Sequence, residues 1–188
     1  LSLRDSFNII EFNSVYTRLW QDPMPASEAN RAAGQDFVRG LRSEGGTEMA
    51  APLRAALCGS CAKPGSLRQI IFITDGAVGN EQQLFTLINQ GIGNSRLFTV
   101  GIGAAPNSYF MRKAALAGRG TFHYINSATA VSESLAGFFN KLENPVLASI
   151  ALAIDGQPAR EMAPANIADL YQGEPLVVTM KLDGRPAT

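Results

Sequence analysis

The sequence is poor in the residues that bind transition metals or build disulfide frameworks. Its 188 residues include only two cysteines, one histidine and one tryptophan. A structural zinc site takes four ligands, mostly cysteine and histidine, so these side chains are too few to form one. His123 lies in the apolar segment 121–125 without a serine, cysteine or acidic partner at a recognisable spacing. This favours a strand residue over a general base.

The sequence also lacks an excess of charge of either sign. It has 16 basic and 16 acidic residues, and no stripe of lysine or arginine stands out. Nucleic acid and anionic membranes are therefore poor candidates as partners. No apolar run approaches the length of a membrane span. The first residue is Leu1 rather than a methionine, and we expect the natural protein to extend further upstream.

The residues present are sufficient for a globular α/β domain, since 46% are apolar and 17% are charged. The most informative stretch is 69–80, where the apolar run 70–73 stops abruptly at Thr74 and Asp75. Such a short, β-branched run predicts a strand covered on both faces, as in a parallel sheet, with residues 71–73 in the core. The Asp75 carboxylate is then expected at the rim of the sheet, where open α/β folds place their ligands.

Strands and helices alternate along the first 143 residues. Segments 7–13 and 15–20 are predicted to form an antiparallel hairpin. Ser27 and Ser108 are predicted N-caps, and Gly91 is predicted to end a helix as a left-handed C-cap. Further strands are predicted at 96–102 and 121–125, with helices over 28–41, from Thr47 onward, and over 81–90, 109–117 and 129–142.

This alternation predicts the fold class. Strands and helices joined by short connections indicate an α/β fold with a doubly wound, mostly parallel sheet and helices on both faces. From about residue 144 the pattern changes to strand-like runs that end in Asp-Gly turns. We therefore predict one α/β domain over residues 1–143 and, over 144–188, a β-rich appendage or the start of a following domain.

Thr47 and Asp75 are the main candidate site residues. Thr47 lies where a loop enters a predicted helix and Asp75 where a strand ends, so both are expected at one rim of the sheet. A hydroxyl and a carboxylate are the hard oxygen ligands that Mg²⁺ prefers. Alternatively, Thr47 is an N-cap and Asp75 forms a turn, and the residue types alone favour this second interpretation.

A family resemblance bears on this choice. The order FNIIEF, GGTEM, IIFITDGAVGNE and RLFTVGIG resembles a von Willebrand factor type A domain that lacks its first strand. Longer segments, including FVRGLRSEGGTEMAAPLRAAL and RLFTVGIGAAPNSYFMRKAALAGRGTF, resemble marine proteobacterial sortase target proteins, which are relatives of inter-alpha-trypsin inhibitor heavy chains. The resemblance runs from about Asp5 to Tyr171 and beyond. It implies a non-enzymatic adhesion or protein-interaction module that is extracellular or at the cell surface, is anchored by a sortase, and binds an acidic side chain of a protein partner.

The same resemblance implies a metal site. Type A domains build a metal-ion-dependent adhesion site from a DxSxS motif after the first strand, a threonine, and an aspartate after the fourth strand. Thr47 and Asp75 match the last two, and in a complete domain they would hold Mg²⁺, or Mn²⁺ or Ca²⁺. No DxSxS occurs in the 188 residues, and the family places it just upstream of Leu1. We therefore expect metal to be absent or weakly bound here.

The absent strand would lie between the strands at 7–13 and 69–74 in this family. Its absence leaves two edges with unpaired backbone groups, which invite another strand. We expect that the missing segment was removed, that a strand from another copy fills the gap by exchange or dimerisation, or that the C-terminal appendage does. Direct pairing of the two strands would contradict this interpretation.

The alternatives to an adhesion module are a thiol oxidoreductase that uses Cys58 and Cys61, a nucleotide-dependent enzyme that uses the glycine-rich turns, and a metal-independent assembly scaffold. The CGSC spacing suits a redox pair, but it follows a predicted helix instead of starting one. A surface loop, with a small disulfide if the protein is exported, is favoured. The two GIG triplets do not extend to the GxGxxG pattern of dinucleotide-binding turns.

Overall fold

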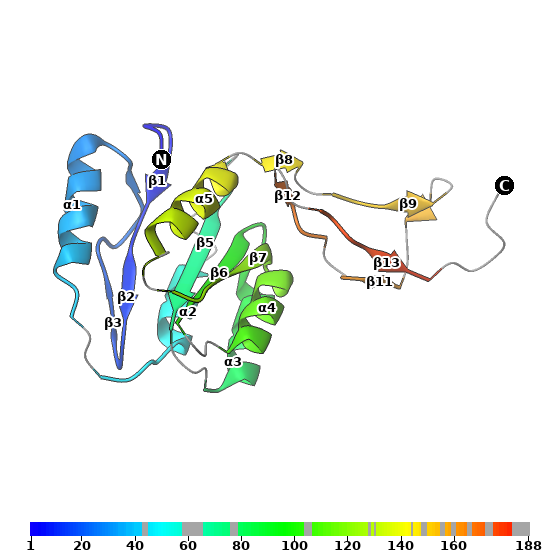
Figure 1. Cartoon of the computed structure of the whole chain (residues 1–188), viewed down its shortest axis with the longest axis horizontal. Helices are drawn as coiled ribbons and strands as arrows, with labels where there is room; N and C mark the ends of the chain where they lie inside the picture. Colours follow the sequence, from blue (N-terminus) through cyan, green and yellow to red (C-terminus); the bar gives the residue numbers. More distant parts are fainter. Residues whose placement is uncertain are drawn as a thin grey trace. The chain divides into compact units, whose positions relative to one another are not determined.

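The computed structural model describes residues 1–42, 45–57, 66–75, 79–103, 107–127, 129, 131–143, 145–147, 150–154, 157–158, 161–164, 167–171 and 175–181. The chain divides into two compact units, and Figure 1 labels the helices and strands of both. One contains Leu1–Ile70 and Asp75–Arg96, and the other contains Ile71–Thr74 and Leu97–Thr188. Among the described residues, no helix is long and apolar enough to cross a membrane.

The first unit begins with two short antiparallel strand pairs. β1 (Ser6–Phe7) pairs with β4 (Met24–Pro25), and β2 (Ile10–Phe12) pairs with β3 (Tyr16–Arg18). The predicted hairpin is therefore confirmed, with shorter strands. Between β1 and β2, the side-chain amide of Asn8 donates to Trp20 O (2.8 Å) and accepts from Trp20 N–H (3.1 Å). The Asn8 side chain thus makes two hydrogen bonds that the backbone makes in a regular strand pair. For this reason β1 and β2 are two separate strands.

Three helices complete this unit: α1 (Glu28–Arg39), α2 (Ala50–Ala56) and α3 (Glu81–Gly91). Ser27 caps α1 as predicted, since its side chain accepts from Asn30 N–H. The left-handed C-cap predicted at Gly91 is wrong, because Gly91 is still helical and the positive φ (48°) occurs at Gly93. A Cβ at Gly91 would lie 3.0 Å from Leu57 Cβ. This glycine therefore permits the close approach of α3 to α2.

The second unit contains most of a three-stranded sheet in the order β5 (Gln69–Thr74), β6 (Arg96–Ile102) and β7 (Arg119–Ile125). β6 and β7 are parallel, and the central strand β6 is buried along nearly all its length. The helices α4 (Ser108–Ala117) and α5 (Val131–Glu143) cover it. These elements confirm the predicted α/β class.

Alternate residues of β6 face different helices. Thr99 donates its hydroxyl proton to Met111 O in α4 (2.8 Å). Its neighbours Phe98 and Val100 belong instead to a buried cluster that includes Phe138 of α5. Because successive residues of a strand point to opposite faces, α4 and α5 lie on opposite faces of this sheet. The predicted two-sided cover is therefore present at β6.

Two local predictions for this unit are wrong. Ile71 packs against the buried cluster and Phe72 is 8% exposed, but Ile73 is 39% exposed and does not belong to the core. β5 is the last strand of this sheet among the described strands, so its faces are covered less completely than those of β6. The N-cap of α4 is Asn107 rather than Ser108, since the Asn107 side chain accepts from Phe110 N–H (3.0 Å).

The chain after residue 144 forms short strands in antiparallel pairs. Its alternate residues Ile167, Asp169 and Tyr171 are at most 7% exposed, and the Tyr171 ring packs edge-on against Phe98 at 5.7 Å between ring centroids. The segment thus contributes to the core of the second unit, while its standing as an appendage or a following domain stays a prediction. The pairs are β8 (Pro145–Leu147) with β12 (Leu170–Tyr171), β9 (Ala153–Ile154) with β10 (Gln157–Pro158), and β11 (Met162–Ala163) with β13 (Thr179–Met180).

The strand pairings bear on the expected gap in the sheet. Among the described strands, β2 pairs with β3 alone and β5 pairs with β6 alone. Direct pairing of β2 with β5, which would have contradicted the expectation of a missing intervening strand, is not found in this part of the chain. The origin of the gap and what fills it stay predictions.

Candidate functional site

Thr47 lies on a loop that is hydrogen-bonded to the β2–β3 hairpin turn on both sides of the threonine. Gly46 N–H donates to Ser14 Oγ (2.8 Å), and Glu48 N–H donates to Asn13 O (2.7 Å). We call these two hydrogen bonds the loop clamp. Because the backbone is held immediately before and after Thr47, the position of this residue is set by the hairpin.

The hairpin turn that receives the loop is itself closed by hydrogen bonds. Asn13 N–H donates to Val15 O (2.8 Å), and Asn13 Oδ1 accepts from Val15 N–H (3.0 Å). Asparagine commonly bonds to the backbone two residues later, which stabilises a turn. Asn13 therefore shapes the turn with its side chain while its carbonyl group holds the loop.

Gly45 is required for this arrangement on two grounds. Its φ is +74°, in the left-handed region where a Cβ atom meets the backbone unfavourably. In addition, a Cβ at this position would lie 2.6 Å from Ser14 Oγ, one of the two acceptors of the loop clamp. Only glycine lets the loop approach the hairpin turn this closely.

Thr47 does not cap a helix, contrary to the alternative derived from the residue types. Helix α2 begins at Ala50 with Met49 at the N-cap position, and no side chain caps it there. Glu48 Oε1 instead accepts from Ala50 N–H (3.2 Å). The Thr47 side chain is exposed, and within the described part of the chain no hydrogen bond engages its hydroxyl. A clamped backbone thus presents an uncommitted hydroxyl group to solvent.

Asp75 directly follows the last residue of β5 and is also exposed. Its carboxylate has no hydrogen bond or ion pair within the described part of the chain. Asp75 and Thr47 belong to the same compact unit, and no hydrogen bond joins them. The structure therefore shows two exposed oxygen donors on connecting segments of one unit, and their role as ligands of one metal site stays a prediction.

The donor set matches the metal only in part. Hydroxyl and carboxylate oxygens are suitable ligands for Mg²⁺, Mn²⁺ or Ca²⁺. However, no group of three or more His, Cys, Asp or Glu side chains able to hold a metal ion occurs among the described residues. Mg²⁺ requires near-octahedral oxygen coordination, so Thr47 and Asp75 supply the correct chemistry but too few ligands to hold it alone.

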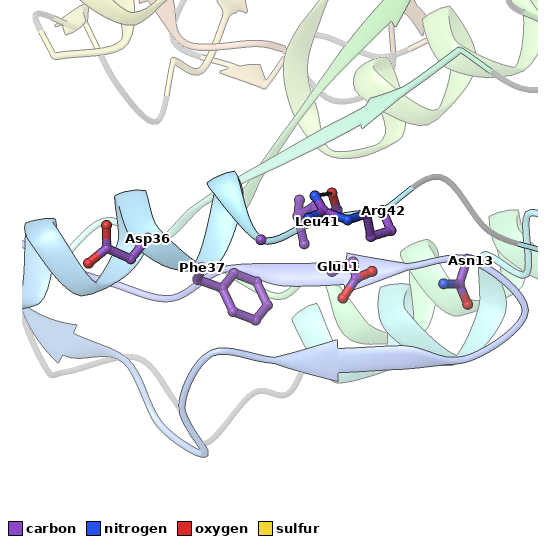
Figure 2. A pocket seen from close by; sticks show the side chains of 7 residues that line it. Glu11, Asn13, Asp36, Phe37, Leu41 and Arg42 are labelled. Atoms are coloured by element: carbon purple, nitrogen blue, oxygen red, sulfur yellow. Dashed lines mark hydrogen bonds between the residues drawn. The ribbon is translucent and has the colours of Figure 1, made fainter.

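A second feature near the loop clamp is a surface hollow of about 380 Å³ between β2 and the C-terminal end of α1. Sequence reasoning did not find it, because its residues come from separate segments. Figure 2 shows Phe37 beside Glu11, with Asn13 beyond the end of β2. One of its two carboxylates, Asp36, already pairs with Arg39 (2.8 Å). The lining residues are Glu11, Asn13, Asp36, Phe37, Gly40, Leu41 and Arg42.

The remaining candidates from the sequence are the two cysteines and His123. Cys58 and Cys61 lie outside the described residues, so the expected redox pair or disulfide stays a prediction. His123 is a strand residue in β7, as predicted, and its ring stacks on Phe138 at 5.4 Å between centroids.

Comparison with known families decides the classification. A family model described as von Willebrand factor type A domain matches residues 1–124. The chain belongs to this family. Type A domains are typically adhesion or protein-interaction modules, commonly bind divalent metal ions, and often occur in extracellular or cell-surface proteins. The family expectation from the sequence is thus confirmed.

Similar proteins support the same assignment. The chain is 28% identical to human inter-alpha-trypsin inhibitor heavy chain H4, over 98% of this chain and 21% of that protein. It is 26% identical to a von Willebrand factor A domain-containing protein of Dictyostelium discoideum, over 92% and 21% respectively. The chain therefore spans about a fifth of the length of these curated relatives.

Among solved structures, a von Willebrand factor type A protein from Catenulispora acidiphila superposes with a TM-score of 0.74 at 25% identity, over 95% of this chain and 45% of that one. This match confirms the type A fold and extends beyond the α/β elements. The narrower expectation of a sortase target protein stays a prediction.

Proposed function

We propose that this type A domain is a non-enzymatic adhesion or protein-interaction module in which Thr47 and Asp75 help to hold a divalent cation that binds an acidic side chain of a partner protein. The loop clamp is the observation that carries the proposal. It fixes the backbone around Thr47 but leaves the hydroxyl exposed, without a hydrogen bond to any described residue, an arrangement that a purely structural threonine does not need.

The two residues have different roles in this proposal. Asp75 contributes negative charge that offsets that of the cation, and Thr47 contributes a neutral oxygen that leaves the cation with net positive charge. A bound cation supplies a local charge and an open coordination position that attract a carboxylate. Because the chain contains no DxSxS motif, we propose that the remaining protein ligands come from a segment outside these 188 residues.

The proposed setting is extracellular or at the cell surface, with anchoring by a sortase. The similarity to an inter-alpha-trypsin inhibitor heavy chain supports the first part of this proposal.

Calorimetric titration of MgCl₂ and MnCl₂ into the full gene product that contains these residues tests the metal role. We expect Asp75→Ala to abolish cation binding and Thr47→Val to weaken it. The matched controls are Asp22→Ala and Thr17→Val, which change exposed residues of the same types in the same unit and should bind as the unaltered protein does. Circular dichroism would show that each variant is folded. Equal affinity of Asp75→Ala and the unaltered protein would refute the proposal.

A further inference from the structure

Helix α4 presents a stripe of large side chains that its own fold does not bury. Its inner residues Phe110, Met111, Ala114 and Ala115 are at most 1% exposed. The outer positions show the complementary i, i+3, i+4, i+7 spacing that places residues on one helical face. They are Tyr109 (62% exposed), Arg112, Lys113 and Leu116 (42% exposed).

The cations on this stripe are held over aromatic rings. Lys113 Nζ lies 4.5 Å from the centroid of the Tyr109 ring, and the Arg112 guanidinium lies 5.8 Å from that of Phe122 in β7. No carboxylate pairs with Arg112 or Lys113 within the described part of the chain. Cation–π contacts orient a cation without neutralising it, so both charges remain available to a partner.

The neighbouring strand β7 extends this surface. Tyr124 is 44% exposed, and its hydroxyl donates to Gly103 O (2.9 Å), which fixes the ring. Tyr124 is two residues after Phe122, so both point to the α4 face of the sheet. β7 is also the terminal strand of the β5–β6–β7 sheet among the described strands. We call Tyr109, Arg112, Lys113, Leu116 and Tyr124 the α4–β7 surface.

The charge along the sequence is uneven in a way that the zero net charge conceals. No acidic residue occurs from 82 to 132, whereas this segment contains Arg96, Arg112, Lys113 and Arg119. Arg96 is buried, but Arg112 and Lys113 are exposed. The two exposed cations of this segment, which the overall composition did not reveal, therefore both lie on α4.

We propose that the α4–β7 surface docks an acidic, extended peptide segment of a partner protein. Tyrosine and arginine are enriched among the residues that dominate binding energy at protein interfaces. A terminal strand can accept an added strand, and glutamates on alternate positions of that strand would reach Arg112 and Lys113. The surface shares no residue with the Thr47–Asp75 site, so this binding goes beyond the proposed cation-dependent function.

The competing explanation is that the cations only protect the sheet edge, since basic residues on terminal strands discourage edge-to-edge association. It accounts for the charge but not for the exposed tyrosines and leucine beside it, because protecting an edge requires no apolar area. Three large exposed side chains, beside two cations that pair with no carboxylate of the described residues, match a docking surface better.

A short capped peptide of alternating glutamate and threonine is the probe, titrated into the isotope-labelled protein while amide NMR signals are followed. A glutamine–threonine peptide controls for charge, and a heparin oligosaccharide tests a sulfated glycan instead. The binding variant is Arg112→Gln with Lys113→Gln. The charge-matched control is Arg31→Gln with Arg54→Gln, which removes two exposed cations from the other unit.

We expect shifts in α4 and β7 with the glutamate peptide, weakening with added salt, and affinity about tenfold lower for the binding variant, because each exposed ion pair contributes modestly. The control variant should bind as the unaltered protein does. Equal binding by the binding variant, equal binding of the glutamine peptide, or binding of heparin alone would overturn the proposal. So would concentration-dependent shifts of this surface without any probe, which would show self-association.

Discussion

Replacing Gly45 by alanine tests the loop clamp directly. The change places a Cβ atom 2.6 Å from Ser14 Oγ, well inside van der Waals contact. Ser14 can relieve this overlap by rotating its hydroxyl away, but the rotation breaks the hydrogen bond from Gly46 N–H. The backbone must also keep a φ of +74°, which L-residues other than glycine adopt at a cost.

These two effects set the expected magnitude. A left-handed backbone costs an ordinary L-residue roughly 1–2 kcal/mol, and the net value of one hydrogen bond is about 0.5–1.5 kcal/mol. Gly45→Ala should therefore lower the free energy of unfolding by about 2–3 kcal/mol. Ser14→Ala alone should cost about 1 kcal/mol. In the Gly45→Ala background the serine change should cost almost nothing, because the bond is already lost, and this difference is measurable as a double-mutant coupling.

Urea unfolding followed by tryptophan fluorescence provides the assay. Trp20 is the sole tryptophan and packs edge-on against Phe7 at 5.3 Å between centroids, within the unit that contains the clamp. The control is Gly79→Ala, since a Cβ at Gly79 meets no atom within 4 Å. If Gly45→Ala and Gly79→Ala unfold within about 0.5 kcal/mol of each other, the close approach of the loop to the hairpin turn is refuted.

Three further predictions concern other parts of the chain. Gly137 lies inside α5, and a Cβ there meets nothing within 4 Å, so Gly137→Ala should raise the free energy of unfolding by about 0.5–1 kcal/mol and increase Tm. Tyr171→Ala should lower it by about 3 kcal/mol in urea titrations because the ring is buried, whereas Leu147→Ala, at a 56% exposed position, should change it by less than about 0.5 kcal/mol. The hydrogen bond from Ser2 N–H (2.6 Å) lowers the pKa of Asp5. NMR titration should therefore place its midpoint below the ordinary value, and its small stabilising effect should be lost as pH falls through that pKa.

The fold was predictable because buried strands and helices have characteristic patterns of apolar residues. The RLFTVGI segment is apolar throughout apart from its first residue and one threonine, and β6 is buried accordingly. Thr99 satisfies its hydroxyl by donating to Met111 O in α4, so even the polar residue of this run fits a strand between two helices. A parallel strand covered on both faces requires this composition, and few other structures do.

Exact element ends were less predictable because neighbouring residues offer equivalent chemistry. Asn107 and Ser108 are both good N-caps, and the structure uses the earlier one. Gly91 and Gly93 can both end a helix, but Gly91 lies against Leu57 of the preceding segment. The end of α3 thus depends on a contact with a residue more than 30 positions earlier in the chain. No local sequence pattern indicates such a contact.

The candidate site, like the fold, was predictable from the sequence only in part. Its two candidate oxygen donors were proposed from the sequence because family motifs mark them, but the hydrogen bonds that position Thr47 could not be predicted. Ser14 and Gly46 are 32 residues apart, and each is adequately explained locally, the serine as a turn residue and the glycine as the end of a helical segment. Only the folded chain shows that the turn is the acceptor for the loop.

Stability and binding should respond differently to a change at Thr47, and this difference separates the two explanations of that residue. If Thr47 capped α2, its replacement by alanine would cost about 1 kcal/mol of stability. In the structure α2 starts three residues later and the Thr47 hydroxyl is exposed, so Thr47→Ala should leave the urea midpoint unchanged. Glu48 N–H and Gly46 N–H would still hold the backbone. A variant with unaltered stability and weakened Mn²⁺ binding would therefore identify Thr47 as a positioned ligand, whereas a loss of about 1 kcal/mol with unaltered binding would identify it as a cap.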